Sequence, residues 1–382
     1  MARVLVSALD ASGDLHAADC VRALRALRPD LEVFGAGGAA LREAGAQIVV
    51  DQRELAVAGM VEVLEIVPAA LRAARRLTRE AAARGARLAV LVDAPDFHLP
   101  LARRLRRAGL PVLAYIGPNV MRWRRGRVHQ MARRVDRLAS IFPFEPPLYA
   151  ATPLRVDYVG HPLVEPLRRL RERLDRASAR TLLGLPAGAP LVALLPGSRR
   201  NELTRMLPLF VETARVLRAR RPDVALALGL APSLEQADVE ARLRALWSDA
   251  PVALVAGRSR ELLRAADVAL AKPGTVTMEA ALLGCPLVVA GRTDPFSAAL
   301  WRRLSHVKTF AMPNLIHGGA LVPEFLQGDA QPGRIAAALL ALLGGPEREK
   351  QQAGLEEVRK RLGDDVAAER AAAIADSMLT AR

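Results

Sequence analysis

The chain is poor in cysteine, histidine clusters and aromatic residues. Its two cysteines, Cys20 and Cys285, stand far apart without metal-site spacing, so we expect reduced, buried thiols rather than a disulfide scaffold. The six histidines form no HxxxH or HExxH cluster, and no metal site is predicted. Aromatic residues make up 4% of the chain, which leaves few side chains to stack on bases. No nucleic-acid-binding fingerprint is present, and we expect no nucleic-acid partner.

Long apolar runs are also missing. No run reaches the roughly 18 residues that a membrane span requires. The apolar stretch after Met1 is short and leads directly to Asp10 and Asp14, which is not typical of a signal peptide. We therefore expect a cytoplasmic protein whose chain begins with its first strand.

Basic residues, in contrast, are abundant. The 55 Lys and Arg residues exceed the 40 Asp and Glu residues and give a formal net charge of +15. Such a charge favours nucleic acid, an anionic membrane surface or an anionic substrate as a partner, although compositional bias towards arginine accounts for part of it. With 382 residues, half of them apolar, the chain is large enough for two globular domains.

Short apolar runs alternate with helical patterns in both halves of the chain. The runs are 3–7, 32–34, 48–50, 87–92, 111–116 and 139–142 in the first half, and 191–195, 224–228, 252–254, 268–270 and 286–289 in the second. This alternation predicts parallel sheets with helices on both faces. We predict an α/β protein of two Rossmann-like, doubly wound domains, residues 1–165 and 166–350, facing an interdomain cleft. A helix over about 351–382 is expected to pack back on the first domain.

Two junctions in the second half join a strand, a glycine and a helix. Their candidate binding residues are Gly197, Ser198 and Arg199 in the first junction, and Gly274, Thr275 and Glu279 in the second. Gly274 is expected to permit a tight turn, and N–H groups at the helix start that follows would bind phosphate. Arg199 can bind two phosphate oxygens at once, and Glu279 can accept hydrogen bonds from a vicinal diol such as ribose. The pattern favours a nucleotide-sugar site; an ordinary strand–turn–helix junction is the alternative.

Acidic residues follow two strands of the first half. Asp93 closes the most apolar strand, where a carboxylate can act as the base that removes a hydroxyl proton. Asp96 is an alternative base, but a role as a helix or turn cap is at least as well supported. Asp10 and Ser12 follow the first strand, where they suit phosphate or sugar binding, with an N-cap by Ser12 as the alternative.

Two surface stretches and one glycine run need separate mention. Residues 57–67 are strongly apolar and are followed by four arginines up to Arg79, a pattern that suits either interfacial membrane contact or a core helix with an arginine face. Residues 122–127 form a basic loop for an acceptor phosphate or an anionic membrane. Residues 35–40 approach a dinucleotide fingerprint, but they follow the second strand and no acidic residue ends a later strand at the required distance.

Taken together, these motifs resemble those of the lipid-A-disaccharide synthase family. The stretches that carry the resemblance are 11–14 (ASGD), 54–64 (ELAVAGMVEVL), 93–97 (DAPDF), 142–145 (FPFE), 160–162 (GHP), 194–199 (LLPGSR), 274–279 (GTVTME) and 313–315 (PNL). Their order and spacing extend over nearly the whole chain. Departures lie at Leu9-Asp10, where the family reads Gly-Glu, at residues 117–123, which lack one tryptophan and two serines, and at Pro273.

The resemblance implies a GT-B fold and an inverting glycosyltransferase that needs neither metal nor other cofactor. The donor would be UDP-2,3-diacylglucosamine and the acceptor 2,3-diacylglucosamine 1-phosphate, with a β-1',6-linked disaccharide 1-phosphate and UDP as products. Asp93 would be the general base, and Asp10 and Ser12 would border the cleft. Asn314 would join Arg199, Thr275 and Glu279 in serving UDP and the catalytic centre.

The resemblance also implies an enzyme associated peripherally with the inner membrane, because both substrates carry acyl chains. Two alternatives stay open at this point. One is a related GT-B enzyme that acts on another UDP-sugar, as a transferase to a different lipid or as an epimerase. The other is a non-catalytic, basic membrane-binding protein on the same scaffold.

Overall fold

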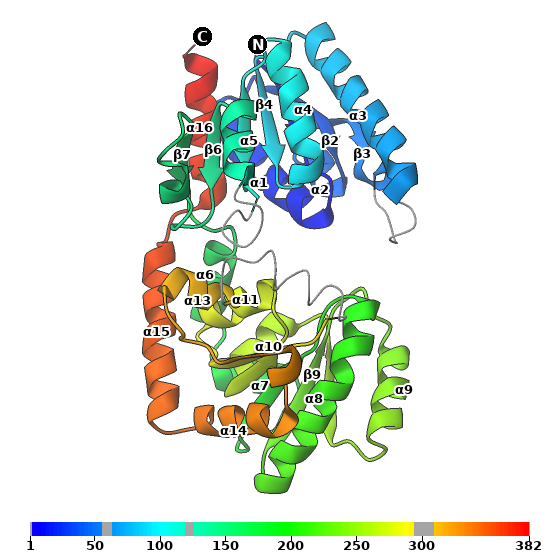
Figure 1. Cartoon of the computed structure of the whole chain (residues 1–382), viewed down its shortest axis with the longest axis vertical. Helices are drawn as coiled ribbons and strands as arrows, with labels where there is room; N and C mark the ends of the chain where they lie inside the picture. Colours follow the sequence, from blue (N-terminus) through cyan, green and yellow to red (C-terminus); the bar gives the residue numbers. More distant parts are fainter. Residues whose placement is uncertain (1, 56–62, 119–125, 294–308, 382) are drawn as a thin grey trace. The chain divides into compact units, whose positions relative to one another are not determined.

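The computed structural model describes residues 2–55, 63–118, 126–293 and 309–381. It divides into two compact units, Met1–Pro162 with Asp364–Arg382 and Leu163–Gly363, each built around one parallel sheet (Figure 1). Residues 122–125 of the predicted basic loop (122–127) and residues 57–62 of the predicted apolar stretch (57–67) lie outside the described residues.

Unit 1 contains seven described strands in the order β3-β2-β1-β4-β5-β6-β7, all parallel. The strands are β1 (Arg3–Ser7), β2 (Glu32–Gly37), β3 (Gln47–Asp51), β4 (Leu88–Val92), β5 (Val112–Tyr115), β6 (Arg137–Ser140) and β7 (Arg155–Tyr158). The helices are α1 (Ala11–Leu27), α2 (Ala39–Glu43), α3 (Val63–Ala83), α4 (Pro95–Arg107), α5 (Gly126–Arg134) and α16 (Ala367–Thr380), with short 3-10 turns at Gln52–Glu54 and Pro146–Tyr149.

Unit 2 contains six described strands in the order β10-β9-β8-β11-β12-β13, again all parallel. The strands are β8 (Leu191–Leu195), β9 (Ala225–Leu230), β10 (Val252–Ala256), β11 (Val268–Ala271), β12 (Leu287–Gly291) and β13 (Glu324–Leu326). The helices are α6 (Val164–Arg173), α7 (Arg176–Leu182), α8 (Arg200–Arg220), α9 (Gln236–Leu246), α10 (Ser259–Ala265), α11 (Thr275–Leu283), α13 (Met312–His317), α14 (Pro332–Leu342) and α15 (Pro346–Leu362), with a 3-10 turn at Gln327–Asp329.

The strands β4 and β5 in the middle of unit 1 are buried on both faces, which explains their apolar sequences. Val4 and Val6 of β1 belong to the core on the side of α1 and α16, whereas Leu5 belongs to the core on the side of α3, α4 and α5. This alternation follows from the two-residue period of a strand. The same arrangement recurs at β8, all of whose residues are buried.

The tail differs from the single helix expected over 351–382. α15 ends at Leu362, Gly363 follows with φ +67°, and only α16 packs against α1 of unit 1. Alanine side chains at the α1 contact allow close approach, and Arg28 of α1 forms an ion pair with Asp376 of α16. Residues 351–362 therefore belong to unit 2, and the chain crosses between the units after Pro162 and again after Gly363.

Candidate active site

In each sheet the strand order reverses at one position. In unit 1, β2 and β3 lie on one side of β1 and β4 to β7 lie on the other; in unit 2, β9 and β10 lie on one side of β8 and β11 to β13 on the other. Ligands of open α/β sheets bind at the carboxyl ends of the strands at such a reversal. The candidate residues of unit 1 follow β1 and β4, and most of those of unit 2 follow β8 and β11, so both sets lie at these positions.

The turn after β4 has an unusual backbone. Asp93 and Ala94 both adopt left-handed conformations, with φ of +53° and +43°, and Ile116 after the neighbouring strand β5 has φ of +64°. Such conformations cost about 1–3 kcal/mol each in residues other than glycine and cluster at functional sites. For the β-branched Ile116 the conformation is a genuine outlier. The strain therefore lies at the carboxyl ends of β4 and β5, next to the predicted base.

The surroundings of Asp93 favour proton uptake. Burial and the nearby Asp10 carboxylate raise the pKa of Asp93, and a hydrogen bond from the Ala94 N–H only partly offsets them. A base with a raised pKa takes up a proton more readily at neutral pH. The predicted pair Asp93 and Asp10 is therefore brought close enough to interact electrostatically.

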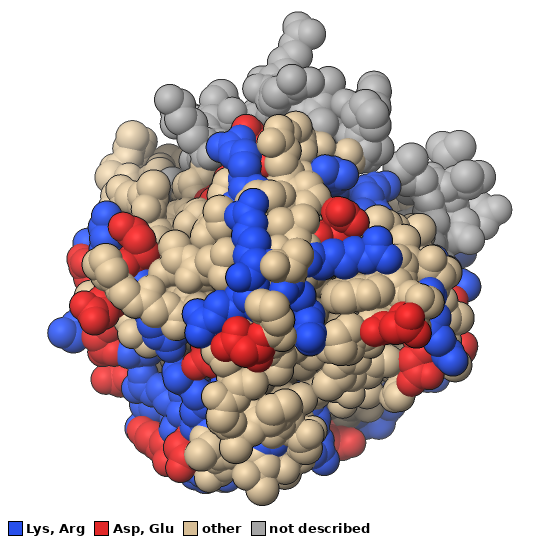
Figure 2. Space-filling model, turned by 90° about the horizontal axis from the view of Figure 1, so that it is seen from below, with Lys and Arg blue, Asp and Glu red and all other residues tan. Residues whose placement is uncertain are grey.

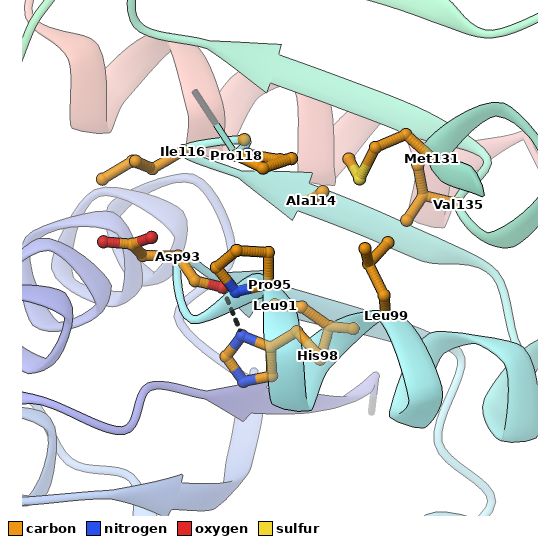
Figure 3. Close-up of a pocket in the computed structure, with 11 residues that line it drawn as sticks. Leu91, Asp93, Pro95, His98, Leu99, Ala114, Ile116, Pro118, Met131 and Val135 are labelled. Carbon is orange, nitrogen blue, oxygen red and sulfur yellow. Dashed lines mark hydrogen bonds between the residues drawn. The ribbon is translucent and has the colours of Figure 1, made fainter. Parts of the chain in front are cut away.

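His98 of α4 lies directly under this turn. Its Nδ1 is 2.6 Å from the carbonyl oxygen of Asp93, and its Nε2 is 2.9 Å from the Ser7 hydroxyl at the end of β1. Figure 3 shows the first of these bonds, with the Asp93 carboxylate directed away from Leu99. Burial lowers the pKa of His98 to about 4, so the ring is neutral at neutral pH. The sequence pattern did not single out His98, since its bonding partners appear only in the folded chain.

A small apolar cavity lies beside Asp93 and His98. Its side chains come from β4, β5, α4 and α5 (Figure 3). With a volume of about 20 Å³, the cavity has room for about one water molecule. The cavity is therefore too small to hold a sugar, and it leaves the Asp93 carboxylate on the side away from its apolar lining.

Asp10, rather than Ser12, caps α1. The Asp10 side chain accepts a hydrogen bond of 2.6 Å from the Gly13 N–H, and its extended backbone is that of an N-cap residue. Ser12 lies in the first helical turn, exposed, with its hydroxyl 3.4 Å from His16 Nε2. The prediction of a Ser12 cap is thus wrong, because Asp10 precedes the helix and Ser12 is already within it.

Asp14 binds two N–H groups of the glycine run 35–40, which would bind a pyrophosphate in a dinucleotide site. Its carboxylate is buried and accepts hydrogen bonds from the N–H groups of Gly38 (2.7 Å) and Ala40 (2.9 Å) at the start of α2. A Cβ atom at Gly37 would lie 2.9 Å from the same carboxylate. The glycines after β2 therefore make room for Asp14.

Asp96 has a different partner from the one expected. The N-cap of α4 is Ala94, which makes no side-chain cap, while Asp96 is largely exposed and forms an ion pair with Arg127 of α5. The expectation of a cap by Asp96 is therefore replaced by an ion pair between two helices. Unlike the exposed Asp96, Asp93 is partly buried.

The turn between β8 and α8 carries a carboxylate at the helix start. Gly197 has φ of +141°, and a Cβ atom there would lie 2.7 Å from Glu202 Cβ. Glu202 accepts hydrogen bonds from the N–H groups of Ser198 (3.0 Å) and Arg199 (3.4 Å), and its other oxygen is 2.7 Å from Lys272 Nζ. Burial raises the pKa of Glu202, but Lys272 and the two N–H groups outweigh it and the net shift is downward.

These groups form a site for negative charge that Glu202 itself fills. The N–H groups of Ser198 and Arg199, together with Lys272, are donors that bind a phosphate well. The Arg199 side chain is 84% exposed, and its nearest contact with Glu202 is a long one of 3.7 Å. The guanidinium group is therefore available to a ligand. Glu202 and Lys272 were not among the predicted site residues, although a glutamate three residues into a helix start is a known capping signal.

The turn between β11 and α11 differs from the expectation in one respect. Gly274 has φ of +160°, an extended conformation, and a Cβ atom there would meet nothing closer than 3.5 Å. The turn therefore uses no conformation that only glycine adopts, although three residues alone separate the end of β11 from the start of α11 at Thr275. Glu279 lies one turn further and accepts a hydrogen bond of 2.8 Å from Arg260 Nε of α10, which leaves its carboxylate further acceptor capacity.

Asn314 of α13 is committed to the structure of unit 2. Its Nδ2 donates to the Val322 carbonyl and to Glu324, and its Oδ1 accepts from the N–H groups of Leu321 and Val322, at 2.7–2.9 Å. Its side chain is buried, and both donors and both acceptor positions are in use. Asn314 therefore orders the segment before β13, and a contribution to the reacting centre would be indirect.

Several general expectations can be compared with the described residues. Both cysteines are buried and free. Within the described ranges, no group of three or more His, Cys, Asp or Glu side chains is placed to hold a metal ion, and no helix there is long and apolar enough to cross a membrane. Lys and Arg side chains spread over the face drawn in Figure 2, with acidic side chains between them, so basic charge alone does not identify a binding surface.

The fold is shared with known glycosyltransferases. A solved structure of the glycotransferase of kitacinnamycin superposes with a TM-score of 0.66 at 18% sequence identity, covering 99% of this chain and 98% of that chain. The likeness confirms the predicted GT-B fold with two α/β domains.

Sequence comparisons are more specific. A lipid-A-disaccharide synthase from Anaeromyxobacter dehalogenans (strain 2CP-1) is 43% identical over 364 residues, 95% of this chain and 94% of that protein. The lipid-A-disaccharide synthase from Myxococcus xanthus is 42% identical over 372 residues, covering 97% and 96%. The family model described as lipid-A-disaccharide synthetase matches residues 4–378. With both strand-end sites inside that match, this chain belongs to the lipid-A-disaccharide synthase family.

Proposed function

We propose that this glycosyltransferase moves 2,3-diacylglucosamine from UDP to the 6-hydroxyl of 2,3-diacylglucosamine 1-phosphate. The product is the β-1',6-linked disaccharide 1-phosphate, and UDP leaves. The observation that carries the proposal is the family match over residues 4–378, which includes the sites of both units. It disfavours both the epimerase and the non-catalytic alternatives.

Asp93 is the general base in this proposal. As the acceptor oxygen attacks the anomeric carbon, the carboxylate takes up the hydroxyl proton, and the electron pair of the breaking bond leaves with UDP. The nearby Asp10 and the partial burial of Asp93 support this role, since both raise the pKa of the Asp93 carboxyl. The reaction requires no metal, because the charge of UDP is compensated by protein groups.

Unit 2 supplies those groups. The start of α8 with Arg199 and Lys272 binds the diphosphate, and the start of α11 with Thr275 adds further N–H donors. Glu279 accepts hydrogen bonds from the ribose hydroxyls with the acceptor capacity that Arg260 leaves. In this proposal the diphosphate displaces Glu202 from the α8 N–H groups.

Association with an anionic membrane surface is a further part of the proposal. α3 exposes Val67 (53%) and Leu71 (39%), and Arg72, Arg75 and Arg76 line a concave surface between α3 and the turn after β3. Apolar side chains beside arginines suit interfacial binding. Each basic residue near an anionic bilayer contributes about 1 kcal/mol. The protein is expected to sediment with anionic vesicles and to dissociate at high salt; equal binding to neutral vesicles would contradict the electrostatic part.

The decisive experiment measures UDP release with defined substrates. The purified protein is incubated with the diacylated donor, with UDP-glucosamine that lacks acyl chains, and with or without the acylated acceptor. The proposal predicts UDP release and disaccharide formation only when both acylated substrates are present. UDP release without acceptor, or transfer to a different lipid, would reject it.

A further inference from the structure

We propose that His98 is a positioning residue for the transfer: it fixes the peptide group after Asp93 and thereby holds the Asp93 carboxylate where it takes the acceptor proton. The inference rests on the proposed role of Asp93 as the base. His98 itself contacts neither the carboxylate nor any reacting atom that the proposal invokes.

The hydrogen bonds of His98 define its tautomer. A carbonyl oxygen can only accept, so the 2.6 Å bond between Nδ1 and the Asp93 carbonyl requires a proton on Nδ1. In a neutral ring Nε2 is then an acceptor, and the Ser7 hydroxyl 2.9 Å away is the donor. His98 is 4% exposed and Ser7 is fully buried, so water does not compete for either bond. The imidazole therefore ties the start of α4 to the end of β1 in one defined orientation.

The bonded peptide is the one that joins the two left-handed residues. Its orientation depends on ψ of Asp93 and φ of Ala94, and Ala94 precedes Pro95, which further disfavours a helical backbone at that position. The Asp93 N–H is bonded to the Tyr115 carbonyl at 3.0 Å, which fixes the other side of the residue. Strained residues of this kind persist only when their surroundings hold them. His98 supplies that restraint on the carbonyl side.

A direct proton-transfer role for His98 is disfavoured by its surroundings. Its Nε2 faces Ser7 and its Nδ1 faces a backbone carbonyl, so neither nitrogen is open to a substrate hydroxyl. Burial holds the pKa of His98 at about 4, well below the value of a base that works at neutral pH. The ring acts through geometry, and its removal should affect turnover more than substrate binding.

The test compares His98→Leu with His98→Asn. The Asn amide can still donate towards the Asp93 carbonyl, whereas Leu cannot. We expect His98→Leu to lower kcat about 100-fold, the loss that a displacement of roughly 1 Å can cause, and His98→Asn to recover at least about a tenth of the wild-type rate. The UDP dissociation constant, measured by calorimetry, should change less than about twofold, because the UDP groups lie in unit 2.

Controls separate positioning from general damage. Thr213→Val removes a buried hydroxyl of α8 in unit 2 that bonds the Leu209 carbonyl, and it should lower the melting temperature while leaving kcat near wild type. All rates are taken well below the lowest melting temperature. A His98→Leu enzyme with near-normal kcat, or a His98→Asn enzyme no faster than His98→Leu, would overturn the inference.

A test that does not depend on activity measures the tautomer of the His98 imidazole by nitrogen NMR. We expect the Nδ1–H tautomer in the wild type and also in Ser7→Ala, where the Asp93 carbonyl still accepts from Nδ1. Because Ser7→Ala removes the bond that holds the Nε2 side of the ring, we expect it to lower kcat by about threefold or more. This variant keeps the inference testable if His98→Leu does not fold. An Nε2–H tautomer in the wild type, or an unchanged rate in Ser7→Ala, would overturn the inference. An inactive wild type with the Nδ1–H tautomer would instead reject the proposed function.

Discussion

The two units place carboxylates at equivalent positions of the same topology but treat them in opposite ways. In unit 1, Asp93 stands beside Asp10, and the two charges repel each other in a strained turn. In unit 2, Glu202 is paired with Lys272 and Glu279 with Arg260. A destabilised carboxylate is a good base, whereas paired charges form a site that can exchange one anion for another.

In the proposed function, one fold divides the reaction between its two copies: unit 1 would supply the base, and unit 2 would supply affinity for the charged leaving group. Each sheet reverses its strand order next to its own candidate residues. The topology therefore determines where these residues lie, and their side chains determine the chemistry.

The largest effect is expected from Asp93→Asn. The neutral amide cannot accept the acceptor proton, and general-base contributions are about 10²–10⁴-fold, so turnover should fall by that factor while UDP affinity stays unchanged. Asp96→Asn is the matched control, since Asp96 is exposed and three residues away. Single-turnover rates at saturating donor decide; a similar loss in both variants would indicate general damage to the turn.

On the unit 2 side, Arg199→Ala and Glu279→Ala should weaken UDP binding. Hydrogen bonds that involve charged groups contribute about 1.5–3 kcal/mol, which corresponds to a loss of affinity of roughly 10-fold or more for each variant. Arg200→Ala is the control, because Arg200 is a neighbouring exposed arginine whose nearest acidic partner is Asp238. Calorimetric titration of UDP is the measurement, and equal affinities in all three variants would remove the donor assignment.

Neutralising the two carboxylates should change stability in opposite directions. The folded-state pKa of Asp93 is raised, so its ionised form opposes folding above that pKa, and Asp93→Asn should raise the melting temperature at pH 7. The pKa of Glu202 is lowered, so its stabilising contribution is present at pH 7 and is lost as the pH falls through the folded-state pKa. Glu202→Gln keeps an oxygen that can cap α8 but loses the charge that pairs with Lys272, so it should lower the melting temperature by about 2–4 °C, the effect of roughly 1 kcal/mol. Shifts of the same sign in calorimetry would contradict the contrast.

The last prediction concerns Glu145, a buried carboxyl in unit 1. Burial, which outweighs hydrogen bonds from Ser140 and from the Phe142 N–H, raises its pKa from 4.5 to about 7. A raised folded-state pKa gives stability that is present below pH 4.5 and lost as the pH rises to 7. The melting temperature of the wild type relative to Glu145→Gln should therefore fall from pH 5 to pH 7 and then level off.

The melting temperature of the wild type is compared with that of Glu145→Gln because other buried groups also titrate in this range. His98 and His161 are buried with lowered pKa values, and they change the stability of both proteins in the opposite direction over the same range. Because both proteins contain these histidines, subtracting one melting temperature from the other cancels the histidine contribution. A constant difference from pH 5 to pH 8 would show that Glu145 titrates at its ordinary pKa.

The central strands were predictable because burial on both faces requires continuous apolar runs, as in β4 and β8. Of the four edge strands, β3 and β10 were predicted, whereas β7 and β13 were missed because they lack such runs. β7 has the partly exposed sequence Arg-Val-Asp-Tyr, and β13 has only three residues, so neither has the apolar run of a central strand.

The candidate site was predictable where it depends on position along a strand. Asp93 and Arg199 follow apolar runs directly, and parallel strands place such residues at one edge of a sheet. The partners were not predictable, because Lys272 meets Glu202 and His98 meets Ser7 across distances of 70 and 91 residues. Asn314 shows the converse case, since a residue quoted for its motif has all its hydrogen-bonding groups committed to its own unit.

The crossing of α16 back to unit 1 has a consequence for synthesis. The core of unit 1 includes Ala371, Ala375 and Leu379, yet about 200 residues of unit 2 are made between Pro162 and Asp364. At roughly 5–20 residues per second, the ribosome needs about 10–40 s to reach α16. During that interval the face of α1 that α16 covers stays open on an otherwise assembled sheet. The two parts of unit 1 are thus made before and after unit 2, and its core is complete only once α16 has been made.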